Sequence, residues 1–131
     1  MELTLDPSGA TPIYQQIAEQ IQRRIALGAL QPGDPLPSVR QLALELTINP
    51  NTVARAYLEL EYQGILDKRQ GQGTFVSAVA PEAARREGER IVGASLQRAV
   101  GEAATFGMSR RAVEALFRET VRAQFESGVR L

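Results

Sequence analysis

The stretch LTINPNTVARAYLELE, residues 46–61, decides which fold this sequence predicts. Asn49 can cap a helix that starts at Pro50, where a proline fits because the first N–H of a helix has no partner inside it. Gly64 marks the end of that helix. An apolar face recurs at helical spacing between these ends, formed by Val53, Ala56, Tyr57 and Leu60. The sequence therefore predicts a helix with one buried face and a polar, exposed N-terminal tip.

A shorter helix is predicted immediately before this one. Ser38 and Gln41 stand three residues apart, as in a capping box, and Leu42 and Leu46 form the apolar side of the helix. Only a few residues around Thr47 separate the two helices, and helices joined so tightly must cross steeply. We therefore predict a helix-turn-helix.

Residues 65–77, ILDKRQGQGTFVS, no longer repeat at helical spacing. An apolar pair, a basic pair, a Gly-Gln-Gly run and Thr-Phe-Val fit two short strands joined by a glycine turn. A hairpin that directly follows a helix-turn-helix is a wing. The predicted fold is mainly α with a small β-hairpin, and residues 1–78 are predicted to form a winged helix-turn-helix domain.

Further helices are predicted on both sides of these elements. In front of them, Thr11 can cap a helix from Pro12, whose isoleucines recur every four residues. After Val79, APEAARREGER is predicted to be a linker that runs into a helix, and Ser109 can cap a final helix. Residues 79–131 are therefore predicted to form a short C-terminal segment of two helices.

We expect the C-terminal segment to hold two chains together. Two helices of about 20 residues cannot bury both of their apolar sides against each other, so a second copy is expected to cover them in a homodimer. They are also too small to enclose a drug-sized cavity of about 300 Å³. A small-molecule effector, if one exists, would bind between subunits or where the wing meets this segment. The predicted dimerisation residues are Ile91, Leu96, Val100, Val113, Leu116, Phe117 and Val121.

Composition excludes several classes of protein. The 131-residue chain contains no cysteine and no histidine, which removes disulfides, thiol chemistry and the commonest general base. Carboxylates such as Glu59, Glu61 and Asp67 show no paired setting that would indicate a hydrolase or a metal enzyme. No run approaches a membrane span, and the first residues lack the build of a signal peptide. We expect a cytoplasmic protein that is not an enzyme and uses no cofactor or metal.

Net charge does not indicate a nucleic-acid partner, because 15 basic residues balance 15 acidic ones. The placement of side chains does indicate one. In a helix-turn-helix the second helix enters the DNA major groove, where asparagine can pair with adenine and arginine with guanine. The first turn of the preceding helix would meet phosphates, and a narrow glycine tip could enter a minor groove. The residues predicted on these grounds to contact DNA are Ser38, Arg40, Asn51, Thr52, Arg55, Lys68, Arg69 and the tip from Gly71 to Gly73.

Each of these features also has an ordinary structural interpretation. Asn49 and Pro50 can be no more than a well-formed helix start. An isolated Arg40 or Arg55 is commonly a solvated surface residue, and a Gly-x-Gly run is usually only a turn. The order of the parts favours DNA binding, because a capped helix, a tight turn, a second capped helix and a basic hairpin follow one another.

Three motifs add a resemblance to a known family. They are I-x-x-G-x-L-x-P-G-D-x-L-P-S-x-R-x-L-A from Ile25 to Ala43, N-P-N-T-V-A-R-A-Y-x-E-L-E from Asn49 to Glu61, and G-x-G-T-F-V from Gly71 to Val76. The stretch that contains them resembles the winged helix-turn-helix domain of GntR-family bacterial transcription regulators. The second motif and the short segment after the wing are similar to the YtrA-type subfamily. Thr47 departs from the family pattern, since a glycine is common there.

The resemblance implies a regulator that binds operator DNA as a homodimer, usually as a repressor and in this subfamily often of a transporter operon. Two recognition helices about 34 Å apart imply an inverted-repeat operator. Other branches have arginine where this chain has Pro50 and Ala54, so we do not expect their base preferences to transfer. The family's phosphate and base contacts would fall on Ser38, Arg40, Asn49, Asn51, Thr52, Gly71 and Gln72.

The main alternative is a winged helix that binds a protein partner and no DNA. Such a module would tolerate the loss of Arg40, Asn51 and Arg55. It would not tolerate polar substitutions at the apolar residues of the C-terminal segment.

Overall fold

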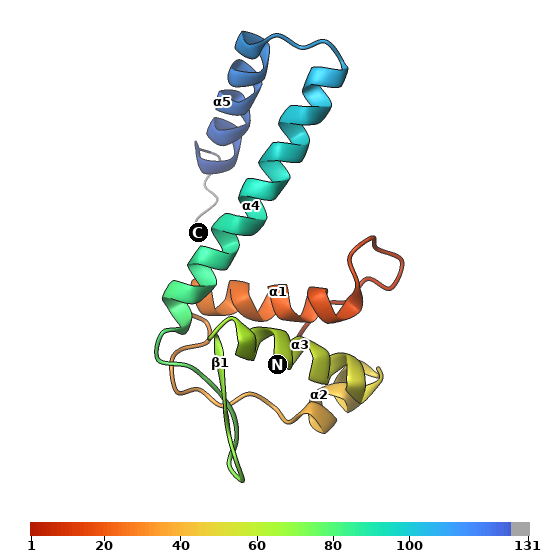
Figure 1. Ribbon diagram of the computed structural model, residues 1–131, viewed down its shortest axis with the longest axis vertical. Helices are drawn as coiled ribbons and strands as arrows, with labels where there is room; N and C mark the ends of the chain where they lie inside the picture. The colour runs from red at the N-terminus through yellow and green to blue at the C-terminus, as the bar shows by residue number, and fades with distance from the viewer. Residues whose placement is uncertain (127–131) are drawn as a thin grey trace. The chain divides into compact units, whose positions relative to one another are not determined.

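The computed structural model describes residues 1–126, which form helices and one β-hairpin (Figure 1). The predicted fold class, mainly α with a small hairpin, is confirmed. In chain order the elements are α1 (Ile13–Ala26), α2 (Val39–Leu46), α3 (Pro50–Tyr62), β1 (Leu66–Arg69), β2 (Gly73–Val76), α4 (Ala80–Thr105) and α5 (Arg110–Glu126).

The chain divides into two compact units, the first from Met1 to Gly88 and the second beginning at Glu89. The division falls inside α4, so the first unit includes the beginning of that helix. The core of the first unit lies between α1, α2 and α3, with α1 and α3 side by side (Figure 1). The largest fully buried side chains of this core are Ile17, Ile21, Ile25, Leu42, Val53, Leu60, Ile65 and Val76.

The beginning of α4 replaces the linker that the sequence predicts after Val79. Ala80, Ala83 and Ala84 are buried in the core of the first unit, at the spacing that places them on one side of a helix. Alanine favours a helix intrinsically and allows its backbone to approach the core closely. The linker prediction was therefore wrong, because burial of this alanine face gives the polar stretch a surface to fold against.

The starts of α2 and α3 have the predicted caps. The Ser38 hydroxyl accepts a hydrogen bond from the Gln41 backbone N–H, and the Gln41 side chain accepts one from the Ser38 N–H, both at 3.1 Å. Asn49 Oδ1 accepts from the Asn51 N–H at 2.8 Å, with Pro50 at the first turn of α3. These polar side chains satisfy N–H groups that would otherwise have no partner.

The start of α1 differs from the prediction. Pro12, not Thr11, is its N-terminal boundary residue, and no side chain caps it. The Thr11 carbonyl instead accepts a hydrogen bond from the Gln16 side chain at 2.7 Å. That same amide group also binds the backbone of Asp6, so Gln16 fixes the segment that enters α1. The hydroxyl cap is not needed because a glutamine one turn later orders this entry.

The turn between α2 and α3 is short because Thr47 adopts a left-handed backbone conformation, with φ of 56°. The N–H of Ile48 then bonds to the carbonyl of Ala43 at 3.0 Å, which closes the end of α2. A β-branched residue rarely adopts positive φ, so this turn stores some strain. The turn nevertheless has the tightness that a helix-turn-helix requires.

The wing is an antiparallel hairpin in which Leu66 pairs with Val76 and Arg69 with Gly73. The loop between α1 and α2 runs along its outer edge. Within that loop the Leu36 N–H donates to the Thr74 carbonyl at 2.8 Å, and Val76 N–H donates to the Asp34 carbonyl at 2.9 Å. The wing is thus tied by backbone hydrogen bonds to the loop that leads into α2.

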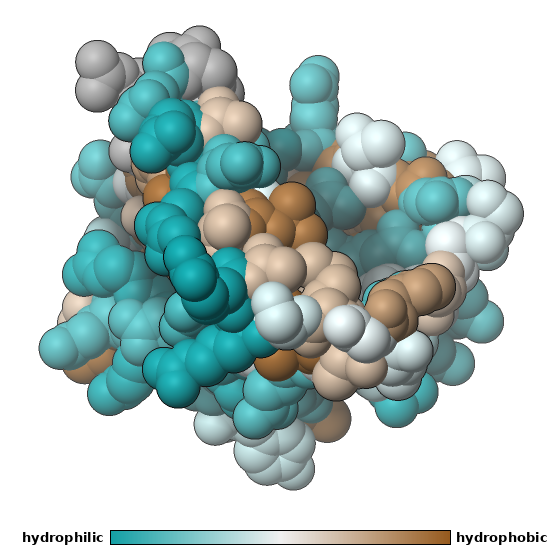
Figure 2. All heavy atoms as spheres, turned by 90° about the horizontal axis from the view of Figure 1, so that it is seen from above, coloured by the Kyte–Doolittle hydropathy of each residue, from teal (hydrophilic) through white to brown (hydrophobic). Residues whose placement is uncertain are grey.

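In the described part of the second unit, residues 89–126, most of the large apolar side chains lie at the surface. No residue of α5 is buried, although Ser109 caps this helix as predicted by accepting from the Ala112 N–H at 3.1 Å. Figure 2 shows brown, apolar atoms at the surface beside hydrophilic ones on the face seen there. Among residues 1–126, no helix combines the length and the apolar character needed to cross a membrane.

Candidate nucleic-acid interface

The recognition-helix candidate, α3, has a buried side that holds it and an exposed side that is free to bind. Val53 and Tyr57 are buried, whereas Asn51 and Arg55 are exposed and Thr52 is partly exposed. The Tyr57 hydroxyl donates a hydrogen bond to the Pro37 carbonyl at 2.7 Å. This bond connects α3 directly to the residue before the capping box of α2.

Tyr57 titrates far from its ordinary range because of this position. Burial raises the pKa of its hydroxyl, and the negative charge of Glu45 raises it further. The phenol therefore stays neutral, and remains a hydrogen-bond donor, at alkaline pH values where an ordinary tyrosine ionises. The two helices of the helix-turn-helix are thus held by a polar contact as well as by apolar packing.

The starts of α2 and α3 present the polar residues that the sequence singled out. Ser38 and Arg40 lie at the exposed beginning of α2, and Asn49 and Asn51 at the exposed beginning of α3. Ser38 and Asn49 use one side-chain oxygen each as a cap, which leaves the Ser38 hydroxyl hydrogen and the Asn49 amide N–H groups available. The ordinary structural role of these two residues is therefore present and does not occupy all their hydrogen-bonding capacity.

Arg55 does not extend freely into solvent. The central carbon of its guanidinium lies 3.8 Å from the centroid of the Tyr14 ring. Tyr14 belongs to α1 and is partly buried against the core. No sequence pattern signals this contact, because the two residues are far apart in the chain.

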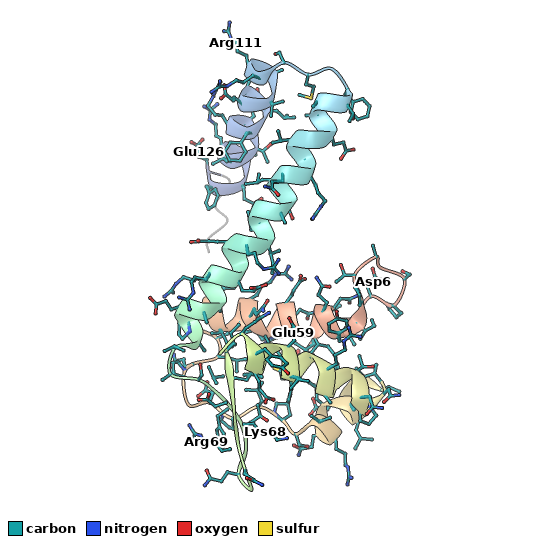
Figure 3. The ribbon with its side chains drawn as sticks, viewed as in Figure 1. Asp6, Glu59, Lys68, Arg69, Arg111 and Glu126 are labelled. Carbon is teal, nitrogen blue, oxygen red and sulfur yellow. The ribbon has the colours of Figure 1, made fainter. Side chains whose placement is uncertain are left out.

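The wing carries its basic side chains on β1. Lys68 and Arg69 are both exposed, and Figure 3 labels them on the hairpin. The Arg69 guanidinium lies over the Phe75 ring, with 4.3 Å between its central carbon and the ring centroid. Asp67 faces Phe75 across the hairpin, so Arg69 reaches Phe75 diagonally from the next position on the same face.

The tip of the wing depends on glycine. Gly71 and Gly73 have φ of 77° and 117°, a backbone conformation that residues with a side chain rarely adopt. The Gln72 N–H closes the turn by donating a hydrogen bond to the Arg69 carbonyl at 2.9 Å. All three tip residues are exposed. The wing thus ends in a narrow turn, as the sequence predicts, with its basic residues directly behind the tip.

The residues predicted to make the dimer lie in the second unit, mostly exposed. Leu96, Val100, Leu116 and Phe117 are each 41–52% exposed, and Ile91 and Val113 are partly exposed. Val121 is also exposed. Leu96 and Val100 of α4 face Leu116 and Phe117 of α5 across an open apolar groove of about 650 Å³. Within residues 1–126, the two helices leave this groove open.

Comparison with known proteins also identifies the first unit as the domain of a regulatory protein. The family described as "Bacterial regulatory proteins, gntR family" matches residues 13–76. The HTH-type transcriptional repressor YtrA of Bacillus subtilis (strain 168) is 48% identical over 75 residues, or 57% of this chain. The match spans only 58% of that repressor.

Two solved structures extend the comparison. A GntR family transcriptional regulator from Listeria monocytogenes is 30% identical, with a TM-score of 0.72, over 88% of this chain and 98% of the other. The DNA-binding domain of AraR in complex with operator ORX1 is 31% identical, with a TM-score of 0.51, over 57% of this chain and 93% of the other. The similar proteins are named as regulators or repressors rather than as enzymes, in agreement with the sequence prediction.

Proposed function

This chain belongs to the GntR family of bacterial regulatory proteins, and from that premise we propose that it regulates transcription by binding an operator as a homodimer. The observation that carries the proposal is the exposed polar start of α3, anchored by its buried side and carried in the same unit as a basic, glycine-tipped wing. AraR, whose DNA-binding domain is similar in structure, was solved on its operator. We propose that α3 of this chain enters a major groove of its operator.

We assign a different kind of DNA contact to each group of side chains according to its position. Asn51 and Thr52 on α3 would contact base edges, while Ser38 and Arg40 at the start of α2 would contact phosphates. Lys68 and Arg69 would bring the wing to the DNA backbone, and the tip from Gly71 to Gly73 would lie at the minor groove. The wing is tied to the loop before α2, so these contacts would be made by one preassembled surface.

The proposed dimer rests on the second unit. Apolar side chains that line an open groove are costly to expose, and a second copy can cover them on the same surface of each chain. A two-fold dimer of this kind would place its recognition helices on two half-sites about 34 Å apart. The operator should therefore be an inverted repeat.

Repression is the regulatory direction that we propose, because the Bacillus relative is named a repressor. The resemblance to the subfamily predicts that the regulated genes form a transporter operon. We also expect the protein to act in the cytoplasm. Any effector would act at the dimer groove or near the beginning of α4. These points concern the whole protein and go beyond the shared DNA-binding segment.

The experiment that tests the proposal is selection of bound duplexes from a randomised pool of double-stranded DNA, with the full chain at near-physiological salt. We expect enrichment of an inverted repeat. A matched selection with Asn51→Ala should lose preference at one position of each half-site, whereas the exposed control Glu82→Gln on α4 should enrich the original sequence.

A selection without enrichment would favour the alternative, a winged helix that binds a protein. One observation supports that alternative. Leu44 of α2 and Tyr62 of α3 are large apolar or aromatic side chains that are 75% and 82% exposed. Capture of a protein partner that is lost on Tyr62→Ser and retained on Asn51→Ala would then identify the binding surface.

A further inference from the structure

Tyr14 and Arg55 form the contact between α1 and the exposed side of α3 that no sequence pattern indicates. The Tyr14 ring is partly buried on one side and carries the Arg55 guanidinium on its face, 3.8 Å from the ring centroid. The ring packs against the core, so its orientation is set by the fold. Arg55 thus lies on a rigid support.

The stacked arrangement leaves the hydrogen-bonding edge of Arg55 free. A cation over a ring uses the flat face of the guanidinium, whereas its N–H groups point outward in the plane. Within residues 1–126, Arg55 has no hydrogen-bond or ion-pair partner, and neither has the Tyr14 hydroxyl. The pair therefore presents unused donors at the surface of α3, and among the described residues no carboxylate forms an ion pair with Arg55.

The direction of Arg55 decides what these donors can reach. A side chain that reads a guanine must extend from the helix into the groove floor, whereas Arg55 turns back toward α1 at the side of α3. When a helix lies in a major groove, its sides face the phosphates that form the groove walls. A guanidinium at the side of the helix is placed for a phosphate oxygen and not for a base.

We propose that Tyr14 is a positioning residue that holds Arg55 as a phosphate contact beside the recognition helix. This inference rests on the proposed DNA-binding function and revises the guanine contact that the sequence suggested for Arg55. An arginine that is already ordered loses less conformational freedom when it binds, so the support of Tyr14 adds affinity without adding a contact of its own. The stack of Arg69 on Phe75 is the same arrangement on the wing.

The test measures affinity of the full chain for its selected duplex and for an unrelated duplex, over a range of salt concentrations. Arg55→Ala should weaken binding to both duplexes by the same factor, and the slope of log affinity against log salt should fall by about 0.9 for each protomer, or about 1.8 for the bound dimer. The selected sequence itself should not change. Loss of preference at a single base pair would show that Arg55 reads a base and would overturn the assignment.

Tyr14 is tested by a double-mutant cycle with Arg55. Tyr14→Leu should reduce affinity about two- to fivefold for each protomer of the bound dimer, as the loss of an exposed cation–π contact allows. The same substitution in the Arg55→Ala background should cause no further loss. Tyr14→Phe keeps the ring and should bind like the wild-type chain, with thermal unfolding of each variant measured as the control for folding.

The outcomes separate this inference from the proposed function. Failure of the wild-type chain to bind any duplex would refute DNA binding itself. Full affinity of Arg55→Ala, together with weakened binding of Asn51→Ala, would refute only the role of the stacked pair. Equal losses from Tyr14→Leu in both backgrounds would show that Tyr14 acts without Arg55, and a loss from Tyr14→Phe would assign the contact to its hydroxyl.

Discussion

At the scale of single residues, this chain shows how a few polar groups organise a helix-turn-helix. Ser38 and Asn49 cap the two helices with their own side chains, and Tyr57 connects α3 to Pro37. Each of these contacts gives a protein partner to a backbone group that has no partner within its own helix or strand. Their removal should therefore affect stability before it affects the DNA-binding surface.

The hydrogen bond of Tyr57 gives a prediction about stability. Tyr57→Phe leaves the Pro37 carbonyl without its partner and should lower the free energy of unfolding by about 0.5–1.5 kcal/mol at pH 7. Urea denaturation measures the change. Tyr62→Phe is the matched control, because Tyr62 is 82% exposed and its hydroxyl should contribute little. Equal effects of the two substitutions would contradict the role assigned to Tyr57.

The same residue predicts a dependence on alkaline pH. Its pKa is raised in the folded state, by burial first and by Glu45 second, while in the unfolded chain it titrates near 10. The folded chain therefore keeps a proton that the unfolded chain loses, so stability contributed by this group is complete below about pH 10 and decreases as the pH rises above it. Denaturation at pH 9 and pH 11 should show this loss in the wild-type chain and a smaller loss in Tyr57→Phe.

Thr47 is a position where substitution should stabilise the chain. Its positive φ costs a β-branched residue about 1–2 kcal/mol, and a glycine avoids that cost while losing part of the gain to the flexibility of its unfolded state. Thr47→Gly should raise the free energy of unfolding by about 0.5–1 kcal/mol in chemical denaturation. Thr47→Ala keeps a Cβ, so its free energy of unfolding should rise less. A Thr47→Gly variant that is less stable than the wild-type chain would show that Thr47 is not strained.

The surface residues should divide into two groups by their effect on binding. Asn51→Ala should change preference at one base pair by about 1–3 kcal/mol, because asparagine can read an adenine edge. Lys68→Ala should weaken all sequences alike and reduce the salt slope by about one for each protomer of the bound dimer. Binding titrations on the selected duplex and on single-base variants measure both. Equal effects from the two substitutions would show that base and backbone contacts are not separated as proposed.

At the scale of elements, the structure differs most from the sequence prediction at the beginning of α4. A polar and alanine-rich stretch was predicted as a linker, yet Ala80, Ala83 and Ala84 are buried in the core of the first unit. Ser77 reinforces this junction, since its hydroxyl donates to the Gly64 carbonyl at 2.6 Å. The wing, the end of α3 and the first turns of α4 thus support one another.

This packing predicts where a stable fragment must end. A fragment of residues 1–88 should retain the buried alanines, whereas a fragment of residues 1–78 would expose the core that they cover. The shorter fragment should unfold at a lower urea concentration, by an amount equivalent to about 2 kcal/mol or more. Equal stability of the two fragments would indicate that the beginning of α4 adds nothing to the domain.

At the scale of the whole molecule, function depends on whether two chains associate through the second unit. Leu116→Asp or Phe117→Asp would place a charge among the exposed apolar side chains of α5, and burying that charge in a dimer would cost several kcal/mol. Sedimentation should then show monomers, with DNA affinity reduced because two linked half-site contacts become independent.

The control for this prediction is Arg111→Asp, which places the same side chain on α5 outside the groove (Figure 3). That variant should remain a dimer. A Leu116→Asp chain that still sediments as a dimer would remove the second unit from the proposed interface. A wild-type chain that sediments as a monomer would do the same.

The sequence by itself determined the features that depend on neighbours within a turn or two. Caps at Ser38 and Asn49, the apolar spacing of α1 and α3, and the glycines of the wing tip all act over a few residues, so their patterns are visible in one chain. The family motifs lie in these same segments. Thr11 shows the limit, because Gln16 orders the start of α1 and a hydroxyl that could cap does not.

Only the tertiary structure decided the contacts between residues far apart in the chain. The stack of Arg55 on Tyr14, the bond of Tyr57 to Pro37, the loop that borders the wing and the burial of the first turns of α4 all require elements to be packed before the partners meet. A polar or alanine-rich stretch has no inherent preference for such partners. Its environment is set by the three-dimensional arrangement, because burial and side-chain direction are properties of the folded surface and not of local spacing.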